Sequence, residues 1–412
     1  MHLTPRCDPP AERRRPPASA AAAMMPEGWL PRALNDGWSY RDRIEARSHG
    51  LPVTAFYAGC YRHSAQAEWQ RRLAAGEIER NGQRLSADLE LVAGDRLAWQ
   101  RPPWWEEAVP ARWAVVHDDG DLLVIDKPAG LPVLPAGGWL EHTVLRLLQR
   151  RHQGDPAGIP RPVHRLGRFT SGLLVCARRP ATRAWLSARL RESTAAGLGR
   201  DVAPGRDGAA AGLAEDPEVA DPEVADPEVA DPEAVAAGPQ DAGDGSAPPA
   251  DGTGGEAWAG PAATAGCRKL YRALLVPGVL ALDPGESLEI TTAIGRRAHP
   301  QLGQIWCAAA GSEAGDLAAR SLLTLLERGA EADLVQVAIA SGRPHQIRIH
   351  CAALGAPLLG DPLYRPGGVA EASARPGEGG YRLQAWRLEL PRPGAGRLVL
   401  EAPVALGCTV NE

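Results

Sequence analysis

The sequence of 412 residues has very little lysine: of its 45 basic residues, only Lys127 and Lys269 are lysines. Arginine therefore serves wherever either cation suffices, and a retained lysine indicates a position that needs a compact ammonium rather than a guanidinium fork. Long apolar runs are also lacking, since none reaches the roughly 18 residues of a membrane-spanning helix. We therefore expect no membrane association.

Closely spaced cysteines are lacking as well. The seven cysteines are scattered without a CxxC pair, which argues against a zinc site, and their odd number fits free thiols in a reducing cytoplasm. The Ala run after the Arg- and Pro-rich N-terminus is too short and too weakly apolar for a secretory signal. We expect a cytoplasmic protein with a disordered tail over residues 1–35, in which Met24 or Met25 is an alternative start.

The net charge of −5 hides an uneven distribution. Residues 201–266 hold 15 acidic residues and one basic residue, so the rest of the chain is net basic. The DPEVA repeat that begins at Asp216 lies in this stretch, and a short acidic repeat with regular proline cannot form a packed core. We expect a disordered acidic low-complexity insertion over residues 197–266. The basic remainder suits a polyanion partner, although a solvated surface is the simpler interpretation of charge alone.

Residues 55–101 have the pattern of a small α+β unit. Ala65, Trp69, Leu73 and Ala74 share one face of a helix, and Gly76 can end it. Asn81-Gly82 then predicts a tight hairpin turn. With Arg71, Arg72 and Arg84 as candidate RNA contacts, the unit resembles the small RNA-binding module of the ribosomal-protein type. A basic fragment of no set function is the alternative.

Residues 112–196 and 267–408 read as one domain on either side of the insertion. Strands are predicted at WAVVH and LLVIDKP, SGLLVCAR, KLYRALLV, LVQVAIA, YRLQAWRLEL and GRLVLEA, and helices at HTVLRLLQRRHQ, PATRAWLSARLRES and the segment ended by Gly355. Strands outnumber helices and fall mostly in hairpins. The expected fold class is α+β, with a mixed, largely antiparallel sheet.

Four segments carry the chemistry: DDGDLLVIDKPAGLPV, HRLGRFTSGLLV, KLYRALLV and SGRPHQIRIHCAALGAPLLGDPLY. In this order and spacing they resemble the RluA family of RNA pseudouridine synthases, over roughly residues 113–405 apart from the insertion. The RPPWWE run from Arg101 to Glu106 also fits this resemblance. The resemblance implies a pseudouridine synthase core and an N-terminal RNA-binding module.

The resemblance implies a reaction without metal or cofactor, in which a uridine of structured rRNA or tRNA becomes pseudouridine. The bond from the sugar to the ring nitrogen breaks, the uracil turns, and carbon 5 bonds to the sugar and loses its proton. Such a reaction needs a carboxylate at the sugar, an aromatic face for the freed base, and a cation that orients the carboxylate. The expected partner is RNA, and we expect a monomer.

The site residues follow from the matching positions. Tyr271 of KLYRAL matches the catalytic tyrosine, Arg348 of HQIR matches the arginine that pairs with the catalytic aspartate, and Arg165 matches the arginine that displaces the target base. The supporting loop and neighbouring motif positions give the predicted substrate-binding residues His164, Thr170, Ser171, Gly172, Lys127, Lys269, His345 and Gln346.

Gly167 stands where the family has its catalytic aspartate, and glycine offers no nucleophile, base or charge. Three interpretations compete. Another carboxylate fills the position, with Asp361 and Asp126 as the candidates within the motifs; the reaction proceeds without one; or the protein binds RNA without modifying it. The resemblance includes branches that carry HRLG, which makes the glycine a trait of a subfamily rather than a random lesion.

Two weaker hypotheses come from single features. His345 and His350 lie five residues apart in HQIRIH, but helical ligand pairs favour three or four, and no carboxylate lies between them, so a metal site is disfavoured. The DPEVA repeat alone suggests a protein-interaction scaffold. The prediction from the sequence is therefore an RNA pseudouridine synthase, with a non-catalytic RNA-binding protein on the same fold as the alternative.

Overall fold

A computed structural model of the chain describes residues 26–61, 64–196, 266–300, 303–340, 342–374, 380–392 and 396–407. The predicted acidic insertion lies outside these ranges apart from residue 266, and so does the predicted tail up to residue 25. Within the described residues, no helix is both long enough and apolar enough to cross a membrane.

The end of the predicted disordered tail is ordered, which corrects that boundary. Strand β1 (Trp29–Leu30) pairs with β8 (Val109–Pro110), and β2 (Ala33–Leu34) pairs with β7 (Trp105–Glu106). The physical reason is that the polar, Ala-rich stretch gives way to apolar side chains, and that of Leu30 packs on the core beneath the main sheet.

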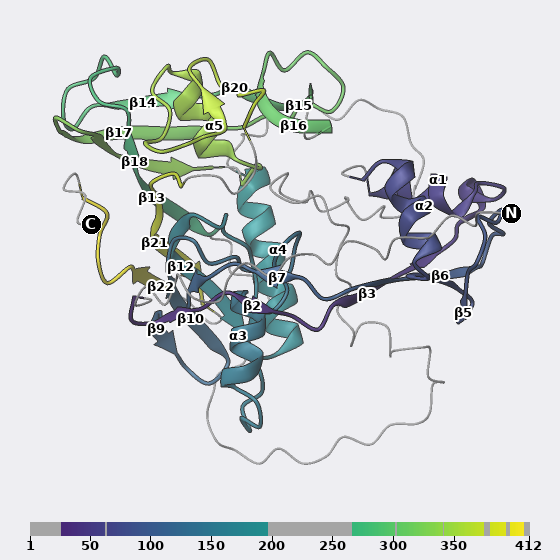
Figure 1. Cartoon of the computed structure of the whole chain (residues 1–412). Helices are drawn as coiled ribbons and strands as arrows, with labels where there is room; N and C mark the ends of the chain where they lie inside the picture. The colour runs from purple at the N-terminus through teal and green to yellow at the C-terminus, as the bar shows by residue number, and fades with distance from the viewer. Residues whose placement is uncertain are drawn as a thin grey trace, which may run out of the picture.

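The N-terminal module forms a four-stranded antiparallel sheet in the order β3-β6-β4-β5, and it lies to one side of the main sheet (Figure 1). It begins before the predicted residue 55, because β3 pairs with β6 along its whole length. Its elements are β3 (Trp38–Arg43), the short 3₁₀ helix η1 (Ala46–Ser48), α1 (Val53–Cys60), α2 (Gln66–Ala74), β4 (Ile78–Arg80), β5 (Gln83–Arg84) and β6 (Arg96–Arg101).

The local signals of this module act as the sequence predicts. Trp69 and Leu73 are buried on α2, and Gly76 follows the helix with a positive φ of 73°. Asn81 and Gly82 both have positive φ at the tip of the β4–β5 hairpin, as a two-residue turn of the primed type requires.

The main sheet has ten strands within the described residues, and it confirms the predicted α+β class with largely antiparallel pairing. The order along the sheet is β14-β17-β18-β13-β21-β12-β10-β9, with β11 beside β12 and β22 beside β21. Its strands are β9 (Ala114–Asp118), β10 (Leu122–Lys127), β11 (Arg161–Pro162), β12 (Thr170–Ala177), β13 (Arg268–Leu275), β14 (Ser287–Ile290), β17 (Ser321–Arg328), β18 (Asp333–Ile339), β21 (Leu383–Pro391) and β22 (Arg397–Glu401).

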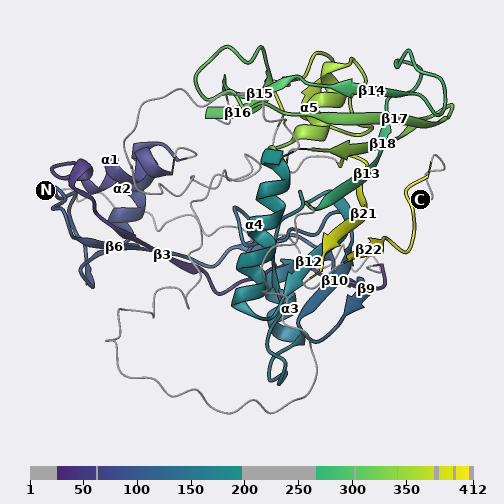
Figure 2. The same cartoon turned by 180° about the vertical axis from the view of Figure 1, so that it is seen from behind.

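Helices cover both faces of this sheet (Figures 1 and 2). On one face, α3 (Val144–Arg151) and α5 (Gln346–Ala353) bury apolar side chains against the sheet. On the opposite face, Leu186 and Leu190 of α4 (Pro180–Ala196) pack on Leu122, Val124 and other apolar residues of the sheet. Because β12 is covered on both sides, its apolar run is nearly continuous, as the sequence SGLLVCAR predicts.

Strand β12 meets β21 in a parallel pair at the centre of the sheet, with Gly172 opposite Ala385. A Cβ on Gly172 would lie 2.3 Å from the carbonyl oxygen of Ala385, and the φ of Gly172 is +100°. The glycine of the TSG sequence is therefore required by the close approach of the two strands.

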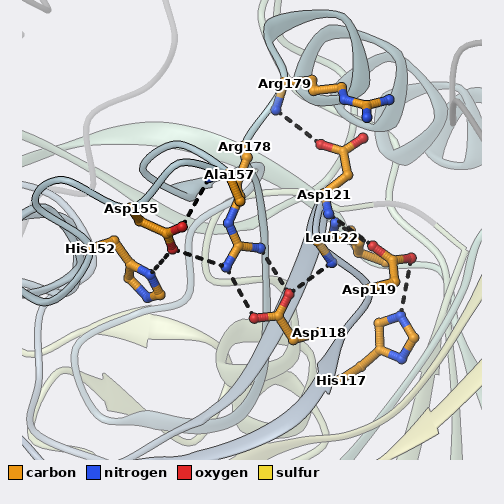
Figure 3. Close-up of polar contacts among 11 residues, drawn as sticks. His117, Asp118, Asp119, Asp121, Leu122, His152, Asp155, Ala157, Arg178 and Arg179 are labelled. Atoms are coloured by element: carbon orange, nitrogen blue, oxygen red, sulfur yellow. Dashed lines mark hydrogen bonds and ion pairs between the residues drawn. The ribbon is translucent and has the colours of Figure 1, made fainter. Parts of the chain in front are cut away.

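A cluster of charged residues fastens the other end of β12 (Figure 3). Arg178, directly after the strand, donates to both carboxylate oxygens of Asp118 at 2.8 and 3.0 Å. Asp121 accepts hydrogen bonds from the backbone of Arg179 and the hydroxyl of Thr182 at the start of α4. The cluster ties the β9–β10 hairpin to the β12–α4 connection.

Several strands between residues 287 and 328 were not predicted from the sequence. Besides β14 and β17, they are β15 (Ala293–His299) and β16 (Gly303–Ala309), which form a separate hairpin. The short pair β19 (Tyr364–Arg365) and β20 (Val369–Ala370) lies beside α5 and β16.

Candidate active site

Three central strands bring two of the sequence motifs together. Gly172 of β12 pairs with Ala385 of β21, and Ala385 pairs in turn with Tyr271 of β13. Tyr271 packs against the apolar cluster that contains Ile347 of α5 and against the cluster that contains Leu166. The predicted catalytic tyrosine, the HRLG loop and the helix that bears Arg348 therefore converge on one face of the sheet.

Tyr271 is half-buried, and burial raises the pKa of its phenol to about 12. The side chain therefore keeps its proton at neutral pH. It presents an aromatic surface and a hydroxyl donor rather than a phenolate, which suits the predicted role of holding a freed pyrimidine base.

Arg348 does not face an empty position. Its Nε and Nη2 donate to the two carboxylate oxygens of Asp361 at 2.8 and 2.9 Å, and both side chains are buried. The backbone amides of Leu363 and Tyr364 also donate to Asp361 Oδ1. Burial acts to raise the pKa of Asp361, but these hydrogen bonds and the Arg348 charge hold it below its ordinary value.

Two tyrosines enclose the guanidinium of Arg348. Its Cζ lies 5.0 Å from the ring centroid of Tyr364 and 4.2 Å from that of Tyr381. Such stacking is favourable for a cation whose solvation is lost. Among the described residues, Arg348 Nη1 is buried without a hydrogen-bond partner, so this arginine retains a donor in addition to its pair with Asp361.

Gly167 lies in the loop between β11 and β12, where its carbonyl accepts from the amide of Thr170 at 3.0 Å. Its φ lies outside the left-handed range, so its conformation does not require glycine. The space around Gly167, however, does favour glycine. A Cβ at this position would lie 2.2 Å from the hydroxyl oxygen of Tyr381 and 3.3 Å from Thr170 Oγ1. The hydroxyl of Tyr381 occupies space that a side chain at position 167 would need.

Asp361 and Asp126 are the two carboxylates that the sequence offers for this place, and neither takes it. Asp361 is fully engaged with Arg348 and two backbone amides. Asp126 alternates with Ile125, which packs beneath α3, so its side chain lies on the opposite face of the sheet. There Asp126, Ser171 and Gln384 line a cavity of about 580 Å³.

The surroundings of Lys127 explain why this position keeps a lysine in an arginine-rich chain. The side chain is fully buried, and Nζ donates to the carbonyls of Pro128, Leu131 and Arg168 at 2.9, 2.8 and 3.0 Å. A compact ammonium fits among three carbonyl oxygens, and a planar guanidinium does not. The predicted substrate contact is therefore replaced by a structural one, because Lys127 joins the DKPAG loop to the HRLG loop.

His164 is the first residue of the HRLG sequence, and Lys269 lies near it on β13. His164 Nε2 accepts from the amide of Val175 at 3.1 Å. Burial, and then the nearby charge of Lys269, lower the pKa of His164 to about 4, so its imidazole is neutral at physiological pH. Lys269 Nζ is 3.4 Å from the carbonyl of Leu190, and burial lowers its pKa. Both residues support the loop from the side of α4.

Of the other residues predicted to contact substrate, one is exposed and two are held by hydrogen bonds within the protein. Arg165 is exposed, which suits a residue that reaches RNA. Gln346 is buried, and its amide nitrogen donates to Arg320 O and Ser321 Oγ. His345 has a left-handed backbone before α5, and its Nδ1 lies 2.6 Å from the Tyr364 hydroxyl. Gln346 and His345 therefore hold the start of α5 in place, and their predicted contact with substrate stays a prediction.

The two histidines considered as metal ligands have separate partners. His350 is buried between Ser321 Oγ and the carbonyl of Thr292, whereas His345 contacts Tyr364. In the described ranges, no group of three or more His, Cys, Asp or Glu side chains is arranged to hold a metal ion.

The arginines of the N-terminal module differ in their surroundings. Arg72 lies between the rings of Trp69 and Trp99, with Cζ 4.3 and 4.4 Å from their centroids, so its first role is packing. Arg71 forms an exposed ion pair with Glu68, and Arg84 is exposed on β5. Arg71 and Arg84 are therefore accessible to RNA, and Arg72 is largely withdrawn from it.

Tyr381 is the functional candidate that the sequence did not reveal. It precedes β21 outside every motif, and its hydroxyl reaches Thr170 Oγ1 at 3.3 Å across 211 residues of sequence. The pairing of a glycine in HRLG with a tyrosine before a distant strand is visible only in three dimensions. Tyr364 lies shortly after the Gly360-Asp361-Pro362 sequence. It is likewise identified by its contacts with Arg348 and His345.

Comparisons with known proteins identify relatives of this chain. The profile of the family described as RNA pseudouridylate synthase matches residues 121–196, from the start of β10 to the end of α4. A Synechocystis protein described as an uncharacterized RNA pseudouridine synthase is 35% identical over 335 residues, which are 81% of this chain and 87% of that protein.

Two further relatives have related names. RNA pseudouridine synthase 5 of Arabidopsis thaliana is 32% identical over 393 residues, 87% of this chain and 89% of the relative. Ribosomal large subunit pseudouridine synthase D of Nitrosomonas europaea is 26% identical over 305 residues, 72% of this chain and 63% of the relative.

Proposed function

Because this chain belongs to the RluA family of RNA pseudouridine synthases, we propose that it isomerises specific uridines of structured rRNA or tRNA to pseudouridine at the Tyr271–Arg348 site. The observation that carries the proposal is the convergence on one sheet face of the half-buried Tyr271, the exposed Arg165 and the buried Arg348–Asp361 pair. These supply the aromatic face, a cation for RNA and a fixed cation beside the reacting sugar.

Each residue has a distinct part in this proposal. The ring of Tyr271 holds the uracil after its bond to the sugar breaks, and its protonated hydroxyl donates to a uracil oxygen. The Asp361 carboxylate fixes the plane of the Arg348 guanidinium, so that the remaining Nη1 donor is available to an oxygen of the substrate. Arg165 enters the space left in the RNA helix by the flipped base.

The reaction needs no oxidant or metal, because it exchanges one bond at the sugar for another and releases the hydrogen of carbon 5. That hydrogen gives a direct assay. RNA from a strain that lacks this protein, labelled with tritium at carbon 5 of uridine, releases tritium to water when a uridine is isomerised.

We expect the wild-type protein to release tritium from this RNA, and we expect Tyr271→Phe to abolish the release. Tyr57→Phe is the matched control, since its hydroxyl is buried in the core of the N-terminal module without a hydrogen-bond partner among the described residues. RNA binding by the wild type without release would favour the alternative function, in which the protein binds RNA and does not modify it.

The predicted cytoplasmic location and monomeric state remain predictions. Gel filtration of the full chain, with and without RNA, tests the monomer, and fractionation of cells tests the location.

A further inference from the structure

The space beside Gly167 holds an oxygen atom from a distant part of the chain. Tyr381 Oη would lie 2.2 Å from a Cβ on Gly167. This is close to the distance that separates a carboxylate oxygen of aspartate from its own Cβ. An aspartate at position 167 would thus place a carboxylate oxygen near the point where this chain has the tyrosine hydroxyl.

The Tyr381 ring is held firmly in this position. Its exposed fraction is 4%, and the ring of Phe169 meets it edge-on, at 5.9 Å between centroids and an interplanar angle of 74°. The hydroxyl lies 3.3 Å from Thr170 Oγ1. These contacts fix the position of the phenol oxygen before substrate binds, as a preorganised group requires.

The cation of the site lies over the same ring. Arg348 Cζ is 4.2 Å from the Tyr381 centroid, and Asp361 fixes the guanidinium in place. In the family's arrangement the arginine accompanies the catalytic aspartate, and here it accompanies the tyrosine. A positive charge over the ring stabilises negative charge that develops on the phenol oxygen.

We propose that Tyr381 Oη is the catalytic oxygen of this protein and takes the part that the missing aspartate at position 167 would have. The inference rests on the proposed function and names the group that acts on the ribose. It also accounts for the absence of a Cβ at Gly167, because the glycine leaves the room that the tyrosine hydroxyl occupies.

The chemistry balances with a phenol as nucleophile, a role that tyrosine has at the anomeric carbon in sialidases. Tyr381 Oη bonds to carbon 1′ as the bond from carbon 1′ to ring nitrogen 1 breaks. The electron pair of that bond stays with the uracil, and nitrogen 1 takes the proton of the phenol.

The second half of the cycle restores the tyrosine. The uracil turns on the face of Tyr271, and carbon 5 bonds to carbon 1′ as the bond from Oη to carbon 1′ breaks. The electron pair returns to Oη, and the resulting phenolate removes the proton from carbon 5. Pseudouridine keeps the proton on nitrogen 1, and no co-reactant is consumed.

The test compares variants in single-turnover tritium release and in RNA affinity, measured by filter binding with the full chain. We expect Tyr381→Phe to lower the release rate at least about 100-fold, as for loss of a reacting group, while RNA affinity stays within about twofold. Tyr57→Phe, the same chemical change in the N-terminal core, should keep the wild-type rate. If the Tyr381 side chain only filled space, Tyr381→Phe would keep the wild-type release rate.

A matched pair of double variants supplies the carboxylate that the family normally has. Removing the hydroxyl leaves Tyr381 Cζ 3.5 Å from a Cβ at position 167, which is ordinary contact. We expect Gly167→Asp with Tyr381→Phe to recover release at least about tenfold over Tyr381→Phe alone. Gly167→Asn with Tyr381→Phe has the same shape without the charge, and it should show no recovery.

The outcomes separate this inference from the proposed function. Release by wild type and Tyr381→Phe at rates within about twofold of each other would overturn the catalytic role of Tyr381 and leave the proposed function intact. Absence of release by the wild type would reject the proposed function, and with it any catalytic oxygen. Release that appears only in Gly167→Asp with Tyr381→Phe would also overturn the inference, since the site would then lack a carboxylate that Tyr381 does not replace.

Discussion

An arginine–aspartate pair lies near each end of strand β12, and the two pairs differ in their surroundings. Near its start, Arg348 pairs with Asp361, and two tyrosine rings flank the guanidinium. Past its end, Arg178 pairs with Asp118, with no ring of the described residues stacked on the guanidinium. Asp155 and His152 extend the cluster toward the surface (Figure 3). The Asp118 side chain is 36% exposed, whereas that of Asp361 is completely buried.

A bidentate arginine–aspartate ion pair therefore does not by itself indicate a functional site. Both pairs fasten chain segments, and both lower the pKa of their aspartate. Each arginine also has a buried donor without a partner among the described residues. Within those residues, the Arg348 pair differs in lying beside two tyrosine rings and a glycine whose missing Cβ makes room for a hydroxyl. This set of neighbours is the reason that the Arg348 pair, and not the Arg178 pair, is assigned to the proposed active site.

The largest expected effect is at the buried pair. Arg348→Ala leaves the Asp361 charge uncompensated, and removing one partner of a buried pair costs about 3–5 kcal/mol of stability. Arg178→Ala should cost less, because Asp118 reaches solvent. Urea unfolding of both variants tests this order, and equal losses would show that burial does not distinguish the two ends of β12.

Replacement of each lysine by arginine tests the structure near the start of β12, where Lys127 pairs across the sheet with Gly172. Lys127→Arg forces a larger cation among three carbonyls, and such overpacking costs up to about 3 kcal/mol. Lys269→Arg is the control, since its Nζ has a single long contact with Leu190 O in the described chain. Thermal unfolding should show a clear loss only for Lys127→Arg, and unchanged stability there would argue against the proposed ammonium site.

Gly167→Ala tests the contact between Gly167 and Tyr381 without any chemistry. The new Cβ collides with the Tyr381 hydroxyl, and the strain should cost about 1–2 kcal/mol. In the double variant with Tyr381→Phe the collision is removed, so the cost of the alanine should largely disappear. Additive losses in urea unfolding would mean that the two positions do not share this space.

The fold followed from the sequence where local signals were strong. Val144, Leu147 and Leu148 identify α3, the apolar run of SGLLVCAR identifies a strand covered on both sides, and Asn81-Gly82 identifies a hairpin. Strand β15 was not predicted because glycine and two arginines interrupt its apolar positions. Strand β17 has an apolar run that does not alternate strictly, so its sequence alone did not distinguish a strand from a helix.

The site was predictable only in part. Tyr271 and Arg348 lie in recognisable motifs, and the sheet brings them to one face. The sequence suggested that Lys127 contacts substrate, but a carbonyl cage explains its retention equally well and only coordinates distinguish the two. Tyr381 has no local signal, because its meaning comes from its contact with a residue more than two hundred positions away.

The pH dependence of stability offers a smaller effect. His164 has a folded pKa of about 4, below the ordinary value of about 6.5, so the unfolded chain binds more protons between these values. Stability is therefore complete above about pH 6.5 and falls as the pH drops toward 4. His164→Gln should flatten this slope in urea unfolding between about pH 7 and about pH 5. An unchanged slope would assign the dependence to other groups.

The smallest effects are expected in the N-terminal module. Arg71→Gln and Arg84→Gln should each lower the salt slope of RNA binding by about 1 with little change in stability, as for loss of one phosphate contact. Arg72→Gln should mainly lower stability, because the guanidinium packs between two tryptophans. Filter binding at several salt concentrations, with thermal unfolding of the same variants, separates the two roles.

The most direct test of the account is the single-turnover rate of tritium release by wild type and by Tyr381→Phe on the same RNA. The expected result is release by the wild type and a loss of at least about 100-fold in the variant, with RNA binding retained. A variant that binds RNA and releases tritium as fast as the wild type would contradict it.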